Sequence, residues 1–170
     1  VGTYFGEDGS TVGYIWRASD QSSHVLTEMN NVIGVNNLGV VSGSVPVNGG
    51  VLFGGLDLGA TATIGMAPMQ LTAPLEENSN GYDIADDGTV VGLSFDSAYN
   101  MDRTKAFVWS AAQGMQVLAT NNPFSYSRAN AISSGSIRLS CPVVRSLITL
   151  SATAACATAS DTATVALPPS

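Results

Sequence analysis

Residues 82–95 read YDIADDGTVVGLSF, and this stretch decides the fold. Its Asp-Gly pair supplies the positive φ that a tight hairpin turn requires. The residues after the turn alternate in character, which places Val91, Leu93 and Phe95 on one face and the residues between them on the other. The stretch therefore predicts a strand that leaves a hairpin.

Two further strands are expected after this hairpin. In AFVWS, Phe107 and Trp109 share a face, and in MQVL, Met115 and Val117 share a face. Large aromatic side chains dominate protein cores, so we expect Phe107 and Trp109 to fill the space between sheets.

The hairpin pattern recurs along the chain. Other copies are IGVNNLGVVSGS at 33–44, FGEDGSTVGYIW at 5–16 and ANAISSGSI at 129–137. The two central copies share one offset, because 39 to 88, 43 to 92 and 65 to 114 are all glycine pairs 49 residues apart. The outer copies deviate, with Gly9 to Gly39 at 30 residues and Gly88 to Gly135 at 47.

Repeats of this length with several strands each are typical of propeller blades. We therefore predict an all-β fold of short antiparallel strands in propeller-like repeats, forming an incomplete or open array. The repeat domain is expected to cover 1–136, with repeats at roughly 5–31, 32–79 and 80–127 and the start of another at 128. A non-repetitive β-sandwich with many Asp-Gly hairpins is the alternative.

The motifs at 80–134 resemble the bacterial extracellular repeats called the HAF family. That pattern is a Gly-x-Val-Val-Gly turn, an Ala-Phe-x-Trp strand, a Gly-Met-x-x-Leu strand and a return to Ala-x-x-Ile. The matching positions are Ile84, Gly88, Val90, Val91, Gly92, Ala106, Phe107, Trp109, Gly114, Met115, Leu118, Ala129 and Ile132. The resemblance implies a propeller-like fold in a secreted or cell-surface protein. It transfers no catalytic residues, because the family has none established.

The segment 137–170 departs from the repeats. It is rich in Ala, Ser and Thr, and it lacks the Val-Val-Gly expected after the last turn. One interpretation is a genuine low-complexity spacer or strand pair, poorly ordered. The other is a change of reading frame near Ser134, which sequencing the gene would test.

Composition excludes several classes of partner. The chain has 13 acidic and 6 basic residues, a net charge of −7 and a single lysine, Lys105. Nucleic acids and anionic membranes need clustered cations, so neither is an expected partner. The longest uncharged run near the C-terminus, 146–160, is too short and too polar to span a bilayer, so no membrane insertion is expected.

No metal site or cofactor is predicted. The two cysteines, Cys141 and Cys156, are compatible with a disulfide or with two thiols, and no zinc-type spacing is present. The acidic turns at 7–9 and 86–88 lack the spacing of a calcium loop, so turn formation explains them better.

Catalytic candidates are few, and none is predicted. Glu76 and Glu77 are adjacent on the chain and are interpreted as a solvated loop rather than as a hydrolase pair. His24, beside Ser22 and near Asp20, is interpreted as a surface or loop residue, because a catalytic triad is recognised by geometry and not by closeness in sequence.

The binding candidates lie in polar loops. Exposed aromatic and amide side chains suit stacking and hydrogen bonding to a glycan or a protein. The predicted ligand-binding residues are Tyr99, Tyr126, Asn121 and Asn122. Trp16 and Tyr82 are further platform candidates if they are exposed.

Three functions are compatible with these observations. The first is an extracellular interaction module that binds a protein or glycan through loops on one face of the array. The second is a structural surface protein without a discrete ligand. The third is a hydrolase with carboxylates in a central groove, which would require a groove lined by two acids with raised pKa.

Overall fold

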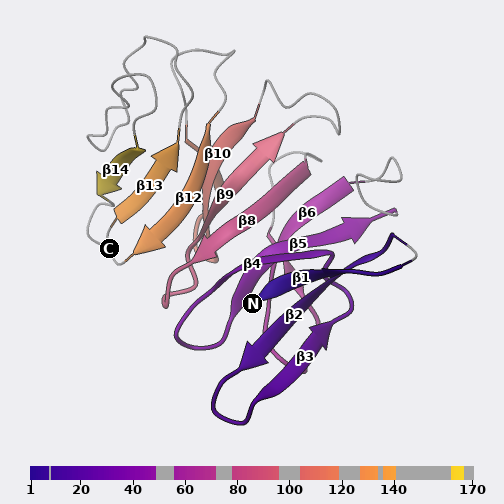
Figure 1. Ribbon diagram of the computed structural model, residues 1–170. Coiled ribbons are helices and arrows are strands. Elements are labelled where there is room, and N and C mark those ends of the chain that lie inside the picture. Colours follow the sequence, from indigo (N-terminus) through magenta and orange to yellow (C-terminus); the bar gives the residue numbers. More distant parts are fainter. Residues whose placement is uncertain are drawn as a thin grey trace.

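The computed structural model describes residues 1–7, 9–48, 56–71, 78–95, 104–118, 127–133, 136–140 and 162–166. In these residues the chain is all-β, as predicted, and its strands form four antiparallel sheets. The sheets follow one another across the molecule in chain order, from the indigo N-terminal sheet to the orange and yellow C-terminal one (Figure 1). The described sheets form an open array rather than a closed ring.

Each sheet is built from strands that are consecutive in the chain. Sheet 1 contains β1 (Gly2–Phe5), β2 (Thr11–Arg17) and β3 (Ser22–Leu26). Sheet 2 contains β4 (Asn31–Val35), β5 (Val41–Val47), β6 (Leu56–Ala62) and β7 (Met69–Gln70). Sheet 3 contains β8 (Asn78–Ile84), β9 (Val90–Phe95), β10 (Lys105–Ser110) and β11 (Gly114–Val117). Sheet 4 contains β12 (Arg128–Ser133), β13 (Ser136–Ser140) and β14 (Thr162–Ala166).

The two glycines of the repeated motif have different physical roles. Gly39 and Gly88 occupy the turns with φ of +77° and +84°, a conformation that other residues rarely adopt. Gly43 and Gly92 lie in the second strand of their sheets, where a Cβ would run into the carbonyl oxygen of Asn31 or of Asn80. The first glycine of the motif is therefore needed for its backbone conformation, and the second for close packing.

In sheets 2 and 3 the second glycine lies opposite a β-bulge. The pairing of β4 with β5 shifts between Val32 and Gly34, and the pairing of β8 with β9 shifts between Gly81 and Asp83, 49 residues later. The bulge brings the first strand of each sheet close to the glycine of the second strand. The third copy of this shift lies in β12, between Ala129 and Ala131.

The core lies between successive sheets. Val90, Phe107 and Trp109 pack with Leu71 between sheets 2 and 3, and Phe107 is fully buried. The opposite face of sheet 3 places Val91 and Ala106 against Ala129 and Ile137 of sheet 4. The alternation predicted from the sequence is thus the alternation of two core faces, and Phe107 and Trp109 fill space between sheets as expected.

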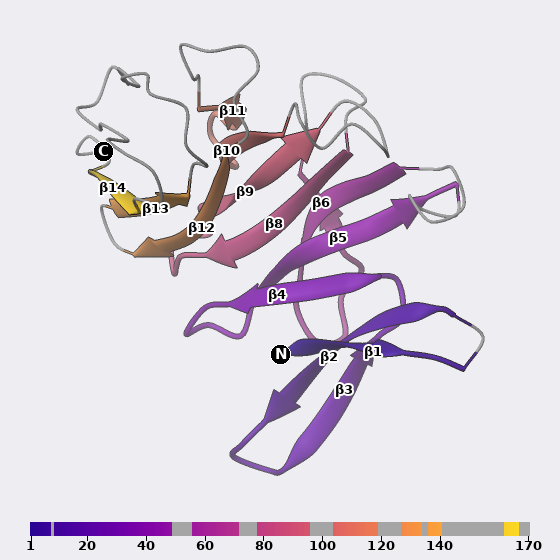
Figure 2. The same ribbon diagram turned by 45° about the horizontal axis from the view of Figure 1, so that its top comes forward.

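Sheet 1 lies at the end of the array, beside β4 (Figure 2). Its residues Ile15 and Leu26 join Val32, Val41 and Met29 in one buried cluster. A Cβ on Gly13 would meet the side chain of Val32, so the sheets approach closely there. The 30-residue offset of this copy therefore still produces a hairpin that packs on sheet 2.

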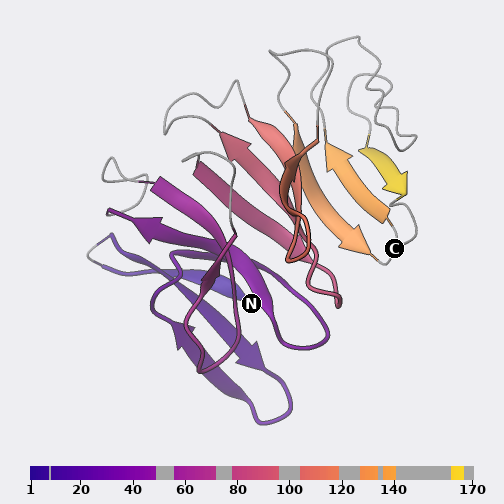
Figure 3. The same ribbon diagram turned by 180° about the vertical axis from the view of Figure 1, so that it is seen from behind.

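Two segments of the predicted tail are strands. β13 pairs with β12 and with β14, which extends the array to a fourth sheet at the C-terminal end (Figure 3). At the register position that Gly43 and Gly92 hold in sheets 2 and 3, sheet 4 has Leu139, paired with Ala129. The cysteines Cys141 and Cys156 lie outside the described residues.

Candidate ligand-binding site

The residues predicted to bind a ligand lie outside the described part of the chain. This applies to Tyr99, Tyr126, Asn121 and Asn122, and also to the carboxylate pair Glu76 and Glu77. The site is therefore assembled from the other polar residues that the structure describes. Of the groups connected by side-chain hydrogen bonds, one in sheet 1 and one at the turns of sheets 2 and 3 contain the residues that the sequence singled out.

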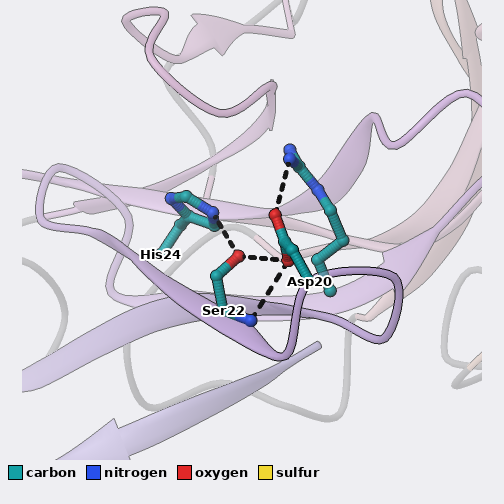
Figure 4. Close-up of polar contacts among 4 residues, drawn as sticks. Asp20, Ser22 and His24 are labelled. Carbon is teal, nitrogen blue, oxygen red and sulfur yellow. Dashed lines mark hydrogen bonds and ion pairs between the residues drawn. The ribbon is translucent and has the colours of Figure 1, made fainter.

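Asp20, Ser22 and His24 form a short hydrogen-bonded chain in sheet 1 (Figure 4). The hydroxyl of Ser22 donates to Asp20 Oδ1 at 2.6 Å, and its oxygen lies 2.9 Å from His24 Nε2. Because the single hydroxyl proton goes to the carboxylate, Nε2 of His24 must donate to Ser22. In a nucleophilic triad the histidine instead accepts the serine proton and the acid orients the histidine.

The same group is satisfied by local contacts. The backbone N–H of Ser22 also donates to Asp20, and Arg17 lies 3.4 Å from the other carboxylate oxygen. The hydrogen bond from the Ser22 hydroxyl is the main cause that lowers the pKa of Asp20. His24 lies within β3 and is half-buried. These contacts stabilise the β2–β3 turn and do not form a charge relay.

The second group joins the turns of sheets 2 and 3. Asn37 donates to Asp86 twice, from its backbone N–H to Oδ1 at 2.9 Å and from its amide Nδ2 to Oδ2 at 2.8 Å. Beside it, the Asn36 amide donates to the carbonyl oxygen of Ala85 at 3.0 Å. Both pairs are 49 residues apart, so each residue bonds to its own counterpart in the next repeat.

Local turn chemistry presents these side chains. Asn36 Oδ1 accepts from the backbone N–H groups of Leu38 and Val40, which holds the β4–β5 turn in shape. In the next repeat, Asp87 Oδ1 accepts from the N–H of Thr89. Asp87 thus has the turn role expected from the sequence, whereas Asp86 bonds to the neighbouring sheet. The Asn37 amide holds the pKa of Asp86 below its usual value, with the Asn37 backbone N–H contributing next.

Asp83 makes the corresponding connection to sheet 4. Its Oδ2 accepts from the backbone N–H of Ile132 at 2.9 Å, and its Oδ1 accepts from the N–H of Ile84. Ile132 is again 49 residues further along. On the other side, a Cβ on Gly34 would lie 2.8 Å from the Asp83 Cα, so the first strands of sheets 2 and 3 approach closely here.

A hollow of about 610 Å³ lies where these three sheets meet. We call it the turn hollow. Its polar lining consists of Asn36, Asn37, Asp83, Asp86, Asp87 and Ser133. Its apolar lining consists of Val35, Ile84, Ala85 and Ile132. Its volume falls in the range of small-molecule sites, about 300–1,000 Å³.

The carboxylates of the turn hollow are arranged as acceptors. All four carboxylate oxygens of Asp83 and Asp86 receive an N–H donor. The pKa of Asp86 is lowered, whereas a general acid at neutral pH needs a raised pKa. Asp86 is therefore not the acid with raised pKa that the hydrolase hypothesis requires.

No group of three or more His, Cys, Asp and Glu side chains in the described part of the chain is placed to hold a metal ion. No helix in the same residues is long and apolar enough to cross a membrane.

Comparisons with protein-family models, curated proteins and solved structures returned no match. The likeness to HAF repeats consequently stands on the motif alone. From the sequence, the Asn36-Asn37 loop is equally suited to amide hydrogen bonding with a ligand and to turn formation, and Asp86 is a turn former. The sequence does not indicate Asp83 or Ser133. The signal that identifies the Asn37–Asp86 pair was present, because the 49-residue offset makes them equivalent positions of neighbouring repeats.

Proposed function

We propose that this chain is a binding module that recognises a glycan in the turn hollow. The HAF-like motif implies that it does so outside the cell. The observation that carries the proposal is the meeting of three successive repeats around one hollow with six polar side chains. Repeat proteins commonly use the loops on one face of the array for recognition.

The lining suits a hydroxyl-rich ligand. Carboxylate and amide oxygens accept hydrogen bonds from hydroxyl groups, and a carboxylate oxygen that already accepts one N–H has a second acceptor position. Asp86 and Asp83 can therefore hold the sheets together and still accept from a sugar. The apolar side chains of Val35, Ile84 and Ile132 offer surface for the C–H face of a sugar ring.

Electrostatics favours a neutral or basic sugar. Asp83, Asp86 and Asp87 line the hollow, and none of the described residues that line it is Lys or Arg. The whole chain carries a net charge of −7. Sulfated, phosphorylated or uronic acid glycans would meet like charge at a short distance. We therefore expect neutral or amino sugars to bind in preference to acidic ones.

A printed array of neutral, amino and acidic oligosaccharides tests the proposal. The purified chain should bind a subset of the neutral or amino glycans. Asp87→Asn should weaken this binding while its amide oxygen still accepts the Thr89 N–H. The matched control is Asp20→Asn, the same substitution in the β2–β3 turn outside the hollow.

Three results would refute the proposal. The first is an array without bound glycan, and the second is binding restricted to polyanionic glycans. The third is binding that Asp87→Asn leaves unchanged. The first outcome would favour a structural protein without a discrete ligand.

A further inference from the structure

The chain contains two Asn-Gly pairs, at 48–49 and at 80–81. In such a pair the backbone nitrogen of the glycine can attack the side-chain amide carbon of the asparagine, because glycine has no Cβ that hinders the approach. The reaction closes a five-membered ring, so the asparagine backbone has to leave the extended conformation and water has to reach the amide. The structure places the two asparagines in opposite settings.

Asn48 lies in an open setting. It follows directly after Val47, the last residue of β5, and its side chain is exposed. Its φ of +53° takes it out of the extended conformation of the strand. The pairing of β5 with β6 ends at Val47 and Leu56, so the strand ladder does not hold Asn48. Water and the backbone geometry therefore both allow the ring to form here.

Asn80 lies in a closed setting. It is an extended residue within β8, paired with Leu93 of β9, and its Oδ1 atom is buried away from water. The following residue, Gly81, is buried as well, and a Cβ on it would lie 3.2 Å from the Cβ of Ser42 in sheet 2. Ring closure at Asn80 would thus require β8 to separate from its neighbours.

The Asp-Gly pair of the β8–β9 turn is a third place where the same ring could form. Here Oδ1 of Asp87 accepts from the N–H of Thr89, and the Gly88 nitrogen donates to the carbonyl oxygen of Ala85 at 3.0 Å. The turn therefore engages both the carboxylate and the attacking nitrogen. Of these three pairs, only the one that begins at Asn48 has an asparagine that is exposed and outside a strand.

We propose that Asn48 is a site of spontaneous covalent modification, at which the folded chain converts asparagine to aspartate and isoaspartate. The Gly49 nitrogen loses its proton and bonds to Cγ of Asn48, while the bond from Cγ to Nδ2 breaks and the amide nitrogen leaves with a proton as ammonia. Water then opens the cyclic imide. Opening at Cγ gives aspartate, and opening at the backbone carbonyl carbon gives isoaspartate.

Both products change the chain at the end of β5. Each adds one negative charge to a chain whose net charge is −7, and isoaspartate also lengthens the backbone by the side-chain carbon. The turn hollow is lined at the opposite end of β5, which is seven residues long. At about 3.3 Å per residue the two ends lie about 20 Å apart. The modification should therefore leave glycan binding intact.

Incubation of the whole chain for days at mildly alkaline pH, folded and in guanidinium chloride, tests the proposal. Digestion after glutamate and arginine places Asn48 in the peptide 29–76 and Asn80 in the peptide 78–103. Mass spectrometry measures the conversion of amide to acid, and electron-transfer fragmentation distinguishes aspartate from isoaspartate. In the folded chain Asn48 should convert at least about tenfold faster than Asn80, because opening of a paired strand costs free energy. In the unfolded chain both should convert at similar rates.

Two variants complete the test. Gly49→Val should stop the reaction at Asn48, because a β-branched side chain hinders the attacking nitrogen. The matched control is Gly50→Val, which keeps the Asn-Gly pair and should react like the native chain. In water labelled with heavy oxygen, each converted Asn48 should take up one labelled atom.

The proposal is overturned if Asn48 remains an amide in the folded chain while it converts in the unfolded one. It is also overturned if Asn80 keeps pace with Asn48 in the folded chain, or if Gly49→Val reacts as fast as Gly50→Val. The result does not depend on the turn hollow, since it is measured on the chain without a ligand.

Discussion

Asn37 and Asp86 lie 49 residues apart in the chain, yet the backbone and the amide of Asn37 both donate to the Asp86 carboxylate. The two residues are the same position of two successive repeats. Such a contact between equivalent positions holds neighbouring repeats of an array together. The turn hollow lies beside the Asn37–Asp86 contact.

Replacing the Asn37 donor with a carboxylate should weaken the contact between Asn37 and Asp86. Asn37→Asp places two carboxylates where a donor and an acceptor now meet, so we expect a lower Tm, by about 2 °C, than Asn37→Ala gives. Thermal unfolding followed by circular dichroism measures the difference. The double variant Asn37→Asp with Asp86→Asn should recover part of the loss, and a strictly additive cycle would contradict the pairing.

The Asp86 carboxyl should make the stability of the folded chain depend on pH. Its pKa in the folded chain is lowered from the usual 3.8 by the Asn37 donors. A lowered pKa contributes stability that is fully present above 3.8 and is lost as the pH falls through the folded-state value. Native and Asp86→Asn chains should therefore converge in stability at low pH. Denaturant titrations at neutral pH and at decreasing acid pH measure this, and a constant gap would be inconsistent with the assignment.

The two motif glycines should differ in their response to alanine. Gly43→Ala drives a Cβ into the Asn31 carbonyl and should cost at least about 2 kcal/mol. Gly39→Ala meets no atom within 4 Å and should cost only about 1 kcal/mol, for its positive φ. Urea denaturation distinguishes the two, and equal losses would show that the bulge is not the constraint.

Phe107 should anchor the core between sheets 2 and 3. It is fully buried, so Phe107→Ala should destabilise the chain by about 3–5 kcal/mol. Val117, its partner across β10 and β11, is exposed, and Val117→Ala should stay within about 0.5 kcal/mol of the native chain. A small loss at Phe107 in urea denaturation would place the core elsewhere.

Ser22 should not behave as a nucleophile. Its hydroxyl donates a hydrogen bond to Asp20, so His24 Nε2 is the donor in the contact between His24 and Ser22. A fluorophosphonate probe should therefore leave Ser22 unlabelled, as judged by mass spectrometry of the intact chain and its peptides. Labelling that disappears in Ser22→Ala would contradict the hydrogen-bond order described above.

The sequence predicted much of this architecture because its signals are local. Asp-Gly turns and two-residue alternation act within one hairpin, and the 49-residue offset identifies neighbours such as Asn36 and Ala85. The β-bulge at Tyr82 is not visible in the alternation, and the role of Asp83 depends on it. How sheet 1 packs depends on the fit of Gly13 to Val32, which only tertiary packing decides.

An amide NMR titration tests glycan recognition in the turn hollow most directly. The labelled chain would be titrated with the neutral oligosaccharide that binds best on the array. We expect saturable shifts at the amides of Asn37, Asp86, Asp87 and Ser133, which line the hollow, and no shift at those of Tyr14 and Trp16 in sheet 1. Shifts confined to sheet 1, or no saturable shift in the lining of the turn hollow, would contradict it.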